Sequence, residues 1–301
     1  MSETNTVAIL GLGVMGGAIA LNLLKAGHRV VGYDVDAGRR DALAAAGVDI
    51  APDARRAAAA ARIVLTSLPH EKALNEIVEA LASGEEPRIV VEMSTMTIEA
   101  KAGAQQRLAA AGHVLLDCPL SGTGAQAKTK DLTVYASGDP QAIAEAAPVF
   151  QAFAKTYFDL GAFGNGSRMK YVANLLVFIH NVAAAEALVL GMKAGLEPHR
   201  IIEVVRQGAG GSRMLEVRGP LMADDDYGTV TAGFPMYYKD LTVIGQFAMK
   251  LDCPTPLLSA TLPIYLAGGA ANPQSDVAAV CRVLEQMAGL KREPREHGKP
   301  D

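Results

Sequence analysis

Cysteine is scarce in this sequence of 301 residues, which contains only Cys118, Cys253 and Cys281. Three cysteines cannot all pair, and none stands in a Cys-x-x-Cys or Cys/His spacing typical of zinc. The sequence therefore argues against a disulfide-stabilised fold and against a structural zinc site. We expect reduced thiols and a cytoplasmic protein.

An excess of basic residues is also missing, because 28 lysines and arginines stand against 32 acidic residues, for a net charge of −4. This balance offers no basic surface for nucleic acid or for an anionic membrane. No stretch of about 18 apolar residues lacks a polar interruption, so we expect neither a membrane span nor a signal peptide. A small-molecule partner fits better.

Apolar residues, in contrast, make up 50% of the chain, which is enough for a large core and for two domains of about 150 residues each. In the first half, short β-branched runs alternate with Ala-rich segments such as 17–26 and 54–61. This alternation predicts an α/β fold, with βαβ units and a doubly wound parallel sheet. The predicted strands are residues 7–10, 29–33, 63–67, 89–93, 114–117 and 133–136.

The character of the chain changes after the glycine-rich stretch 161–166, beyond which helix-like segments continue to about residue 290. We predict a nucleotide-binding domain over residues 1–163, an all-α domain over 164–290 and a charged flexible tail over 291–301. Residues 167–193 contain no proline, and no glycine before Gly191. They predict one interdomain helix of roughly 40 Å that joins both domains.

A glycine turn, Gly11-Leu12-Gly13-Val14-Met15-Gly16, follows the first predicted strand. Its three glycines fall where the chain bends, where backbone approaches a pyrophosphate, and where the helix packs on the sheet. Free amides and the positive end of the helix dipole would then face the phosphates. The motif indicates a Rossmann domain that binds NAD or NADP, although by itself it also fits a tight turn without a ligand.

Asp34 ends the second predicted strand, 23 positions after Gly11, close to the spacing of about 20 expected for a ribose-binding acid. Its carboxylate would accept both ribose hydroxyls and repel a 2′-phosphate. We therefore expect NAD, with NADP as the alternative because Arg39 and Arg40 lie nearby in the sequence. An ordinary solvated acid at the strand end is the other interpretation.

Two further loops follow predicted strands at the same edge of the sheet, Ser67-Leu68-Pro69 and Ser94-Thr95-Met96. Ligands in open α/β sheets bind outside such carboxyl ends. Leu68, Pro69 and Thr95 are therefore candidate walls for the nicotinamide half of the cofactor. Each loop taken alone also fits a plain turn.

Three later segments make the chain resemble the β-hydroxyacid dehydrogenase family, over about residues 6–290. That family includes 3-hydroxyisobutyrate dehydrogenases, tartronate semialdehyde reductases and relatives of 6-phosphogluconate dehydrogenase. The segments are Asp117-Cys118-Pro119-Leu120-Ser121-Gly122, then Gly164-Asn165-Gly166-Ser167-Arg168-Met169-Lys170 with Asn174, and Lys239-Asp240-Leu241.

The long predicted helix carries polar groups that can be placed without the family. At about 100° per residue, Lys170, Asn174, Val177 and Asn181 lie within roughly 60° of one another. Their surroundings are strongly apolar, so these groups need partners or a ligand. A lysine whose pKa falls through partial burial can take the hydroxyl proton while hydride leaves an alcohol. A structural pair with a carboxylate is the alternative for Lys170.

The resemblance implies roles for the individual residues. Lys170 is the implied acid/base catalyst, and Asn174 holds the substrate. The Ser121 hydroxyl and the Gly122 amide bind the substrate carboxylate. Lys239 matches a family lysine that lies near the cofactor and helps to close the site, and a solvated lysine at the start of a helix is the other interpretation.

Departures from the family narrow the expected substrate. Thr123 and Leu175 stand where the family often has a second glycine and a second asparagine. The decarboxylating members that act on phosphorylated sugar acids carry an acid where this chain has Val177, and a histidine where it has Ala173. Imine reductases usually replace the residue at Lys170. A small 3-hydroxy acid, converted to its semialdehyde or 3-keto acid, remains the expected substrate.

Two alternatives to this dehydrogenase stay open, a catalytically silent nucleotide-binding scaffold and an imine reductase-like enzyme. The Ala-rich helical second half offers apolar faces of the kind that family members use to form homodimers or homotetramers. The glycine-rich segment 207–212 is either a connection between helices or a loop that lines the substrate entrance.

Overall fold

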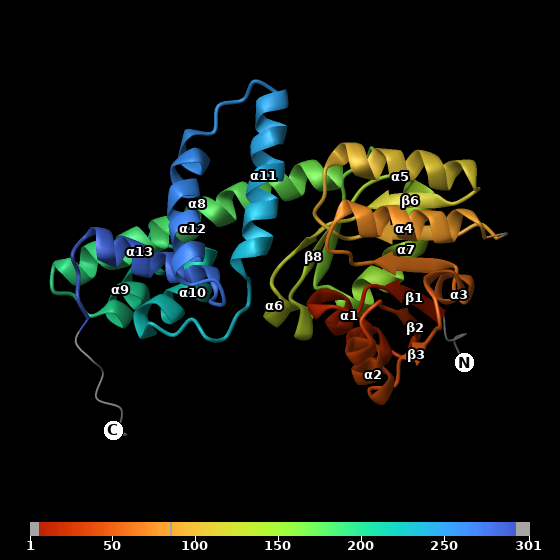
Figure 1. Cartoon of the computed structure of the whole chain (residues 1–301), viewed down its shortest axis with the longest axis horizontal. Helices are drawn as coiled ribbons and strands as arrows, with labels where there is room; N and C mark the ends of the chain where they lie inside the picture. Colours follow the sequence, from red (N-terminus) through yellow and green to blue (C-terminus); the bar gives the residue numbers. More distant parts are fainter. Residues whose placement is uncertain (1–5, 85, 293–301) are drawn as a thin grey trace. The chain divides into compact units, whose positions relative to one another are not determined.

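A computed structural model describes residues 6–84 and 86–292 (Figure 1). The chain forms two compact units, divided between Ala173 and Asn174. The first unit is built on a parallel sheet, and the second consists of helices. The predicted fold class, a doubly wound sheet followed by an all-α domain and joined by a long helix, is confirmed.

Six parallel strands form the main sheet of the first unit in the order β3-β2-β1-β4-β5-β6. The direction of strand order reverses between β1 and β4, which is where doubly wound sheets bind nucleotides. The strands are β1 (Thr6–Leu10), β2 (Arg29–Tyr33), β3 (Asp49–Ile50), β4 (Ile63–Thr66), β5 (Ile89–Glu92) and β6 (Val114–Asp117).

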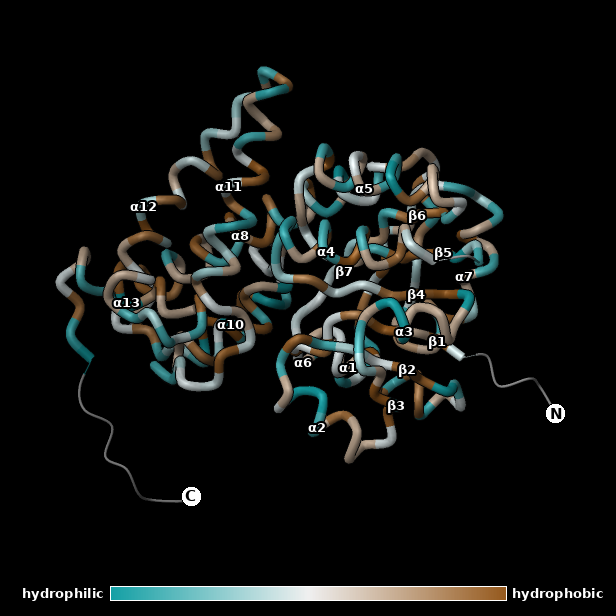
Figure 2. The backbone as a smooth tube through the Cα atoms, turned by 45° about the vertical axis from the view of Figure 1, so that its right-hand side comes forward, coloured by the Kyte–Doolittle hydropathy of each residue, from teal (hydrophilic) through white to brown (hydrophobic). Residues whose placement is uncertain are grey.

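Both faces of this sheet are buried, as expected for parallel strands between helices. In β1, Val7 and Ile9 join one hydrophobic cluster, whereas Ala8 and Leu10 join another. Figure 2 shows hydrophobic residues along central strands such as β4. The helices of this part are α1 (Val14–Lys25), α2 (Ala37–Ala45), α3 (Ala54–Ala59), α4 (Glu71–Ala82) and α5 (Ile98–Ala110).

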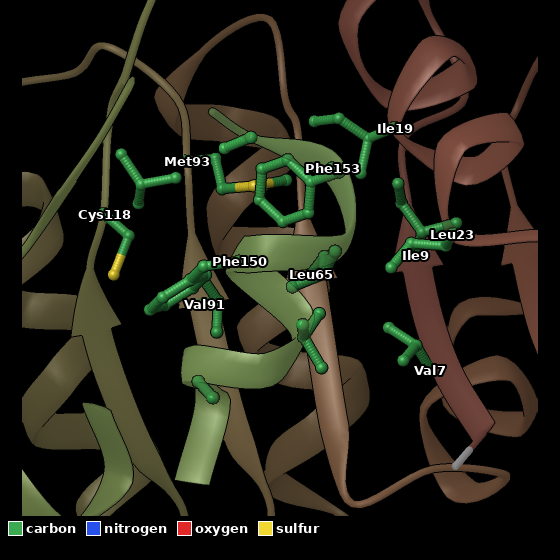
Figure 3. Close-up of a cluster of buried hydrophobic side chains, with 14 of the residues drawn as sticks. Val7, Ile9, Ile19, Leu23, Leu65, Val91, Met93, Cys118, Phe150 and Phe153 are labelled. Atoms are coloured by element: carbon green, nitrogen blue, oxygen red, sulfur yellow. The ribbon is translucent and has the colours of Figure 1, made fainter. Parts of the chain in front are cut away.

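A small mixed sheet extends the first unit. It contains β7 (Leu120–Ser121), β8 (Thr133–Ala136) and β9 (Thr156–Asp159), with α6 (Gly124–Lys128) and α7 (Pro140–Phe153) between them. The predicted strand 133–136 therefore belongs to this second sheet. Phe150 and Phe153 of α7 pack in the same cluster as Ile19 and Leu23 of α1 (Figure 3).

The long helix α8 (Asn165–Lys193) begins in the first unit and continues into the second. By length and composition alone it is apolar enough to cross a membrane, a property that core helices of soluble proteins share. The second unit continues with α9 (Pro198–Val205), α10 (Arg213–Asp224), α11 (Phe234–Lys250), α12 (Pro256–Ala271), the 3-10 helix η1 (Val277–Ala279) and α13 (Val280–Met287). The glycine-rich segment 207–212 connects α9 to α10.

Of the predicted tail, the structure describes only residues 291 and 292, and residues 293–301 lie outside the described part. Arg292 is tied to the helical unit, because its guanidinium donates to the Ala223 carbonyl (2.8 Å) and pairs with Glu285. Arg292, which belongs to the predicted flexible tail, is therefore anchored to the helical unit.

Candidate active site

The glycine turn between β1 and α1 needs glycine for two steric reasons. Gly11 has φ of +94°, and a Cβ there would lie 2.2 Å from the Ser67 carbonyl oxygen. A Cβ at Gly16 would lie 1.9 Å from the Gly11 carbonyl oxygen. At Gly13, in contrast, the nearest atom to an added Cβ is Arg39 Nη1 at 3.6 Å, which leaves this backbone open to a ligand.

The start of α1 has the features of an anion-binding site. Gly13 is the N-cap, no side chain caps the helix, and no acidic residue stands in its first turn. The first amides of a helix have no acceptor within the helix, and the dipole there is positive. The side chain of Leu12 is buried in the core, and Val14 is largely exposed. The turn can therefore hold the pyrophosphate of NAD(P) with backbone amides, so the residues present fit this cofactor.

Asp34 is buried directly after β2 and is fixed by the turn itself. Its Oδ2 accepts the Leu12 amide at 2.7 Å, and its Oδ1 accepts the Asp36 amide at 2.9 Å. Arg39 Nη1 lies 3.5 Å from Oδ2, and Arg40 Nη1 donates to the Asp34 carbonyl at 2.7 Å. Each carboxylate oxygen has lone-pair capacity for one ribose hydroxyl in addition to its amide.

The loops after β4 and β5 are joined to each other. The Leu68 amide donates to Ser94 Oγ at 2.8 Å. Leu68 and Pro69 follow β4, which neighbours β1 in the sheet, and Thr95 follows β5, the next strand beyond β4. The predicted nicotinamide walls and the glycine turn thus share one edge of the sheet.

Ser121 and Gly122 lie at the end of β7, immediately before α6. Gly122 has φ of +134°, a conformation that side chains rarely adopt. Thr123 is the N-cap of α6, where its hydroxyl accepts the Gln126 amide and the Gln126 side chain accepts the Thr123 amide. The threonine that departs from the family pattern therefore serves as a helix cap.

Lys170 and Asn174 stand one helical turn apart on α8, and both are at least nine-tenths buried. Asn174 Nδ2 donates to Asp240 Oδ2 of α11 at 3.0 Å. Lys239 Nζ lies 3.3 Å from Asp240 Oδ1. The sequence analysis predicts no role for Asp240, which appears there only within the segment Lys239-Asp240-Leu241. In the structure it orients the amide of Asn174, and no local sequence signal indicates this role.

Asn181, on the same predicted face of α8, is fully buried and has protein partners. Its Nδ2 donates to Tyr265 Oη at 3.1 Å and lies 3.3 Å from the Val277 carbonyl oxygen. Of the two amides expected to share a face with Lys170, only Asn174 is therefore a candidate for substrate binding.

A sheet in the order 3-2-1-4-5-6, an uncapped glycine turn and a buried acid after the second strand define a dinucleotide-binding domain. Comparison with known families agrees. Residues 6–161 match the NAD binding domain of 6-phosphogluconate dehydrogenase, and residues 164–284 match the NAD-binding domain of NADP-dependent 3-hydroxyisobutyrate dehydrogenase.

Individual relatives cover nearly the whole chain. An NAD-dependent L-serine dehydrogenase of Pseudomonas aeruginosa is 34% identical over 86% of this chain and 90% of its own. A 3-hydroxyisobutyrate dehydrogenase of the same organism is 34% identical over 83% and 88%. The structure of the Mycobacterium tuberculosis 3-hydroxyisobutyrate dehydrogenase with L-serine has a TM-score of 0.85 at 27% identity, covering 94% and 99%.

The chain belongs to the β-hydroxyacid dehydrogenase family. It is an NAD(P)-dependent oxidoreductase.

Proposed function

We propose that this enzyme interconverts a small 3-hydroxy acid and its semialdehyde or 3-keto acid, with Lys170 as general acid/base. The observation that carries the proposal is the pair on α8: a buried lysine, one turn before an asparagine whose amide is held by Asp240. NAD(P), when bound, accepts the hydride in the oxidation direction. Lys170 takes the hydroxyl proton in that direction and returns it in the reduction.

The remaining groups bind the substrate. Because one N–H of Asn174 is bonded to Asp240, the amide oxygen and the second N–H are oriented for the substrate hydroxyl. The Ser121 hydroxyl and the Gly122 amide bind the carboxylate. Lys239 acts near the cofactor, with its ammonium directed by its ion pair with Asp240.

The cofactor is NAD in preference to NADP. Asp34 repels a 2′-phosphate, and two hydrogen bonds from backbone amides keep its carboxylate in place. Arg39 weakens the preference, because its guanidinium stands beside the same carboxylate. Leu68, Pro69 and Thr95 contact the nicotinamide half.

The substrate is a small, unphosphorylated acid. Two relatives that are each 34% identical to this chain are named for L-serine and for 3-hydroxyisobutyrate. Val177 and Ala173 replace the acid and the histidine that the resemblance associates with decarboxylation of phosphorylated sugar acids. Glycerate and threonate belong to the same chemical class as the two named compounds.

A panel of hydroxy acids tests the proposal. We expect 3-hydroxyisobutyrate, L-serine, glycerate or L-threonate to reduce NAD, followed by absorbance of the reduced cofactor, and we expect Lys170→Ala to abolish turnover while NADH still binds. Full turnover in Lys170→Ala would reject the lysine mechanism. NADH binding without turnover on any acid would favour the silent scaffold.

We also propose the larger organisation of the protein. A nucleotide-binding domain covers residues 1–163 and a helical substrate and oligomerisation domain covers 164–290, supported by the family matches to 6–161 and 164–284.

Exposed apolar side chains on α8, α11 and α12 support a homodimer or homotetramer: Leu176, Leu190, Met249, Leu257, Leu262 and Leu266. Light scattering tests the oligomer. The free cysteines support a cytoplasmic location, which fractionation tests.

A further inference from the structure

A buried polar network lies at the carboxyl ends of three neighbouring strands in the first unit. Thr66, Glu92 and Asp117 end β4, β5 and β6, lie in register, and are fully buried. Thr66 Oγ1 donates to Glu92 Oε2 at 3.2 Å. Two carboxylates so far from water need a cation and hydrogen bonds.

Lys101 of α5 supplies the cation. Its side chain is 1% exposed, and Nζ donates to Asp117 Oδ1 at 2.8 Å and to the Ser94 carbonyl at 2.7 Å. Burial by itself lowers the pKa of Lys101, but Asp117 and Glu92 outweigh it and the pKa is raised, so the amine stays charged. One ammonium therefore joins the end of β6 to the loop after β5.

Asp117 continues the network to the start of α8. Its Oδ2 accepts the Ser167 amide at 2.7 Å, and its Oδ1 accepts the Ser167 hydroxyl at 2.8 Å. The Gly166 amide donates to Ser137 Oγ at 2.9 Å. Because the first amides of a helix have no partner within it, these bonds fix where α8 begins. They also fix the direction of Lys170, three residues after Ser167.

A second connection lies one residue beyond Lys170. Tyr171 donates its hydroxyl to the Met96 carbonyl. Ser94 is thus bonded to the network and Met96 to α8, and Thr95 lies between them.

We propose that Lys101 is a positioning residue, whose bonds to Asp117 and Ser94 set the placement of Lys170 relative to Thr95. This rests on the proposed function, in which Lys170 moves the substrate proton. A buried ion pair adds little stability, because desolvation of both charges cancels much of their attraction. Placement of Lys170 is a better explanation for the ion pair of Lys101 and Asp117, since an error of about 1 Å in the position of a reacting group can lower a rate about 100-fold.

Hydrogen exchange of the Lys101→Met variant, measured by mass spectrometry, tests the placement without any substrate. We expect faster exchange than in wild type over residues 94–97 and 165–173. Leu108→Ala is the matched control, because Leu108 is buried on the same helix as a member of a hydrophobic cluster. At a temperature where both variants are folded, the control should keep wild-type exchange in the two segments.

Turnover separates positioning from loss of stability. In Lys101→Met we expect kcat to fall about 10- to 100-fold, with the Kd of NADH, followed by its fluorescence, within about threefold of wild type. Leu108→Ala should keep kcat within about twofold, as expected for a change away from the reacting groups. The triple variant Lys101→Met/Glu92→Gln/Asp117→Asn, which neutralises both buried carboxylates together with the lysine, should regain thermal stability but not kcat.

Unchanged exchange over 94–97 and 165–173 in Lys101→Met would overturn the proposal, whatever the substrate. An equal loss of kcat in Leu108→Ala would do the same. If Lys101→Met does not fold, Ser167→Ala, which removes one hydroxyl, takes its place, and unchanged exchange over 165–173 would then reject the network. Full activity of Lys170→Ala would reject the acid/base role alone, because the exchange result does not depend on it.

Discussion

The carboxylate of Asp34, proposed to bind a ribose, also makes hydrogen bonds within the protein. Its oxygens accept hydrogen bonds from the amides of Leu12 and Asp36, so the acid proposed to select the cofactor also holds the glycine turn. Arg39 stands beside it, more than half exposed, with a guanidinium that suits a phosphate. We therefore expect the preference between NAD and NADP to depend on the pair of Asp34 and Arg39.

Asp34→Asn should move this preference towards NADP. We expect kcat/KM with NAD to fall about tenfold, equivalent to about 1.4 kcal/mol, and kcat/KM with NADP to rise. The amide keeps an acceptor for Leu12 but loses the charge that repels a 2′-phosphate and occupies Arg39. Initial rates with both cofactors measure the ratio. Asp49→Asn, which breaks only the exposed pair with Arg29, should leave the ratio unchanged.

Two glycines within helices, Gly16 of α1 and Gly103 of α5, differ in whether the structure has room for a side chain. A methyl at Gly16 meets the Gly11 carbonyl at 1.9 Å, whereas a methyl at the exposed Gly103 of α5 meets nothing within 4 Å. The first glycine is required by packing. The second only makes its helix less stable than alanine would.

Gly16→Ala should therefore lower the free energy of unfolding by about 1–3 kcal/mol, and weaken NADH binding at least about tenfold. Gly103→Ala should raise the free energy of unfolding by about 0.5–1 kcal/mol and leave binding unchanged. Urea denaturation and NADH fluorescence titration measure both quantities. Intact NADH binding in a folded Gly16→Ala protein would contradict the proposed role of the turn.

The strands of the main sheet could be predicted because burial on both faces requires continuous β-branched runs. The ranges 29–33 and 114–117 agree with β2 and β6, and the ranges 7–10, 63–67 and 89–93 each differ from β1, β4 and β5 by one residue at one end. The two-residue strands β3 and β7 are too short to show a pattern, and β9 is missed because most of its residues are exposed. Its place beside β8 depends on pairing across the chain.

The same limit applies to the polar groups of the site. Glycine spacing predicts the turn because its residues are neighbours in sequence. Lys101, in contrast, looks like any solvated lysine of an amphipathic helix until the fold brings it to Asp117. Asp240 acquires a role only through Asn174, 66 positions away. Such partnerships depend on tertiary contacts that a single sequence does not contain.

The two units can be monitored together through their thiols, because each buries one cysteine. Cys118 lies in the first unit and Cys281 in the second, whereas Cys253 is exposed. Burial raises the pKa of Cys281 to about 12 and raises that of Cys118 further. At pH 8 both buried groups therefore remain protonated thiols, which are poor nucleophiles.

We expect one thiol to react quickly with a chromogenic disulfide reagent at pH 8, and three thiols to react in guanidinium chloride. Cys253→Ser should remove the fast phase without changing the thermal midpoint, since the side chain is exposed. Fast reaction of two or three thiols in the native protein would contradict the packing described for Cys118 or Cys281.

Because Lys170 and Asn174 lie on adjacent turns of α8, their separation along the axis is about 6 Å, from four residues at about 1.5 Å each. The helix thus fixes the distance between the group proposed to move the proton and the group proposed to hold the hydroxyl. Inserting a single residue between them would turn one relative to the other by about 100°. The number of residues between these two positions is therefore as much a part of the site as the two side chains themselves.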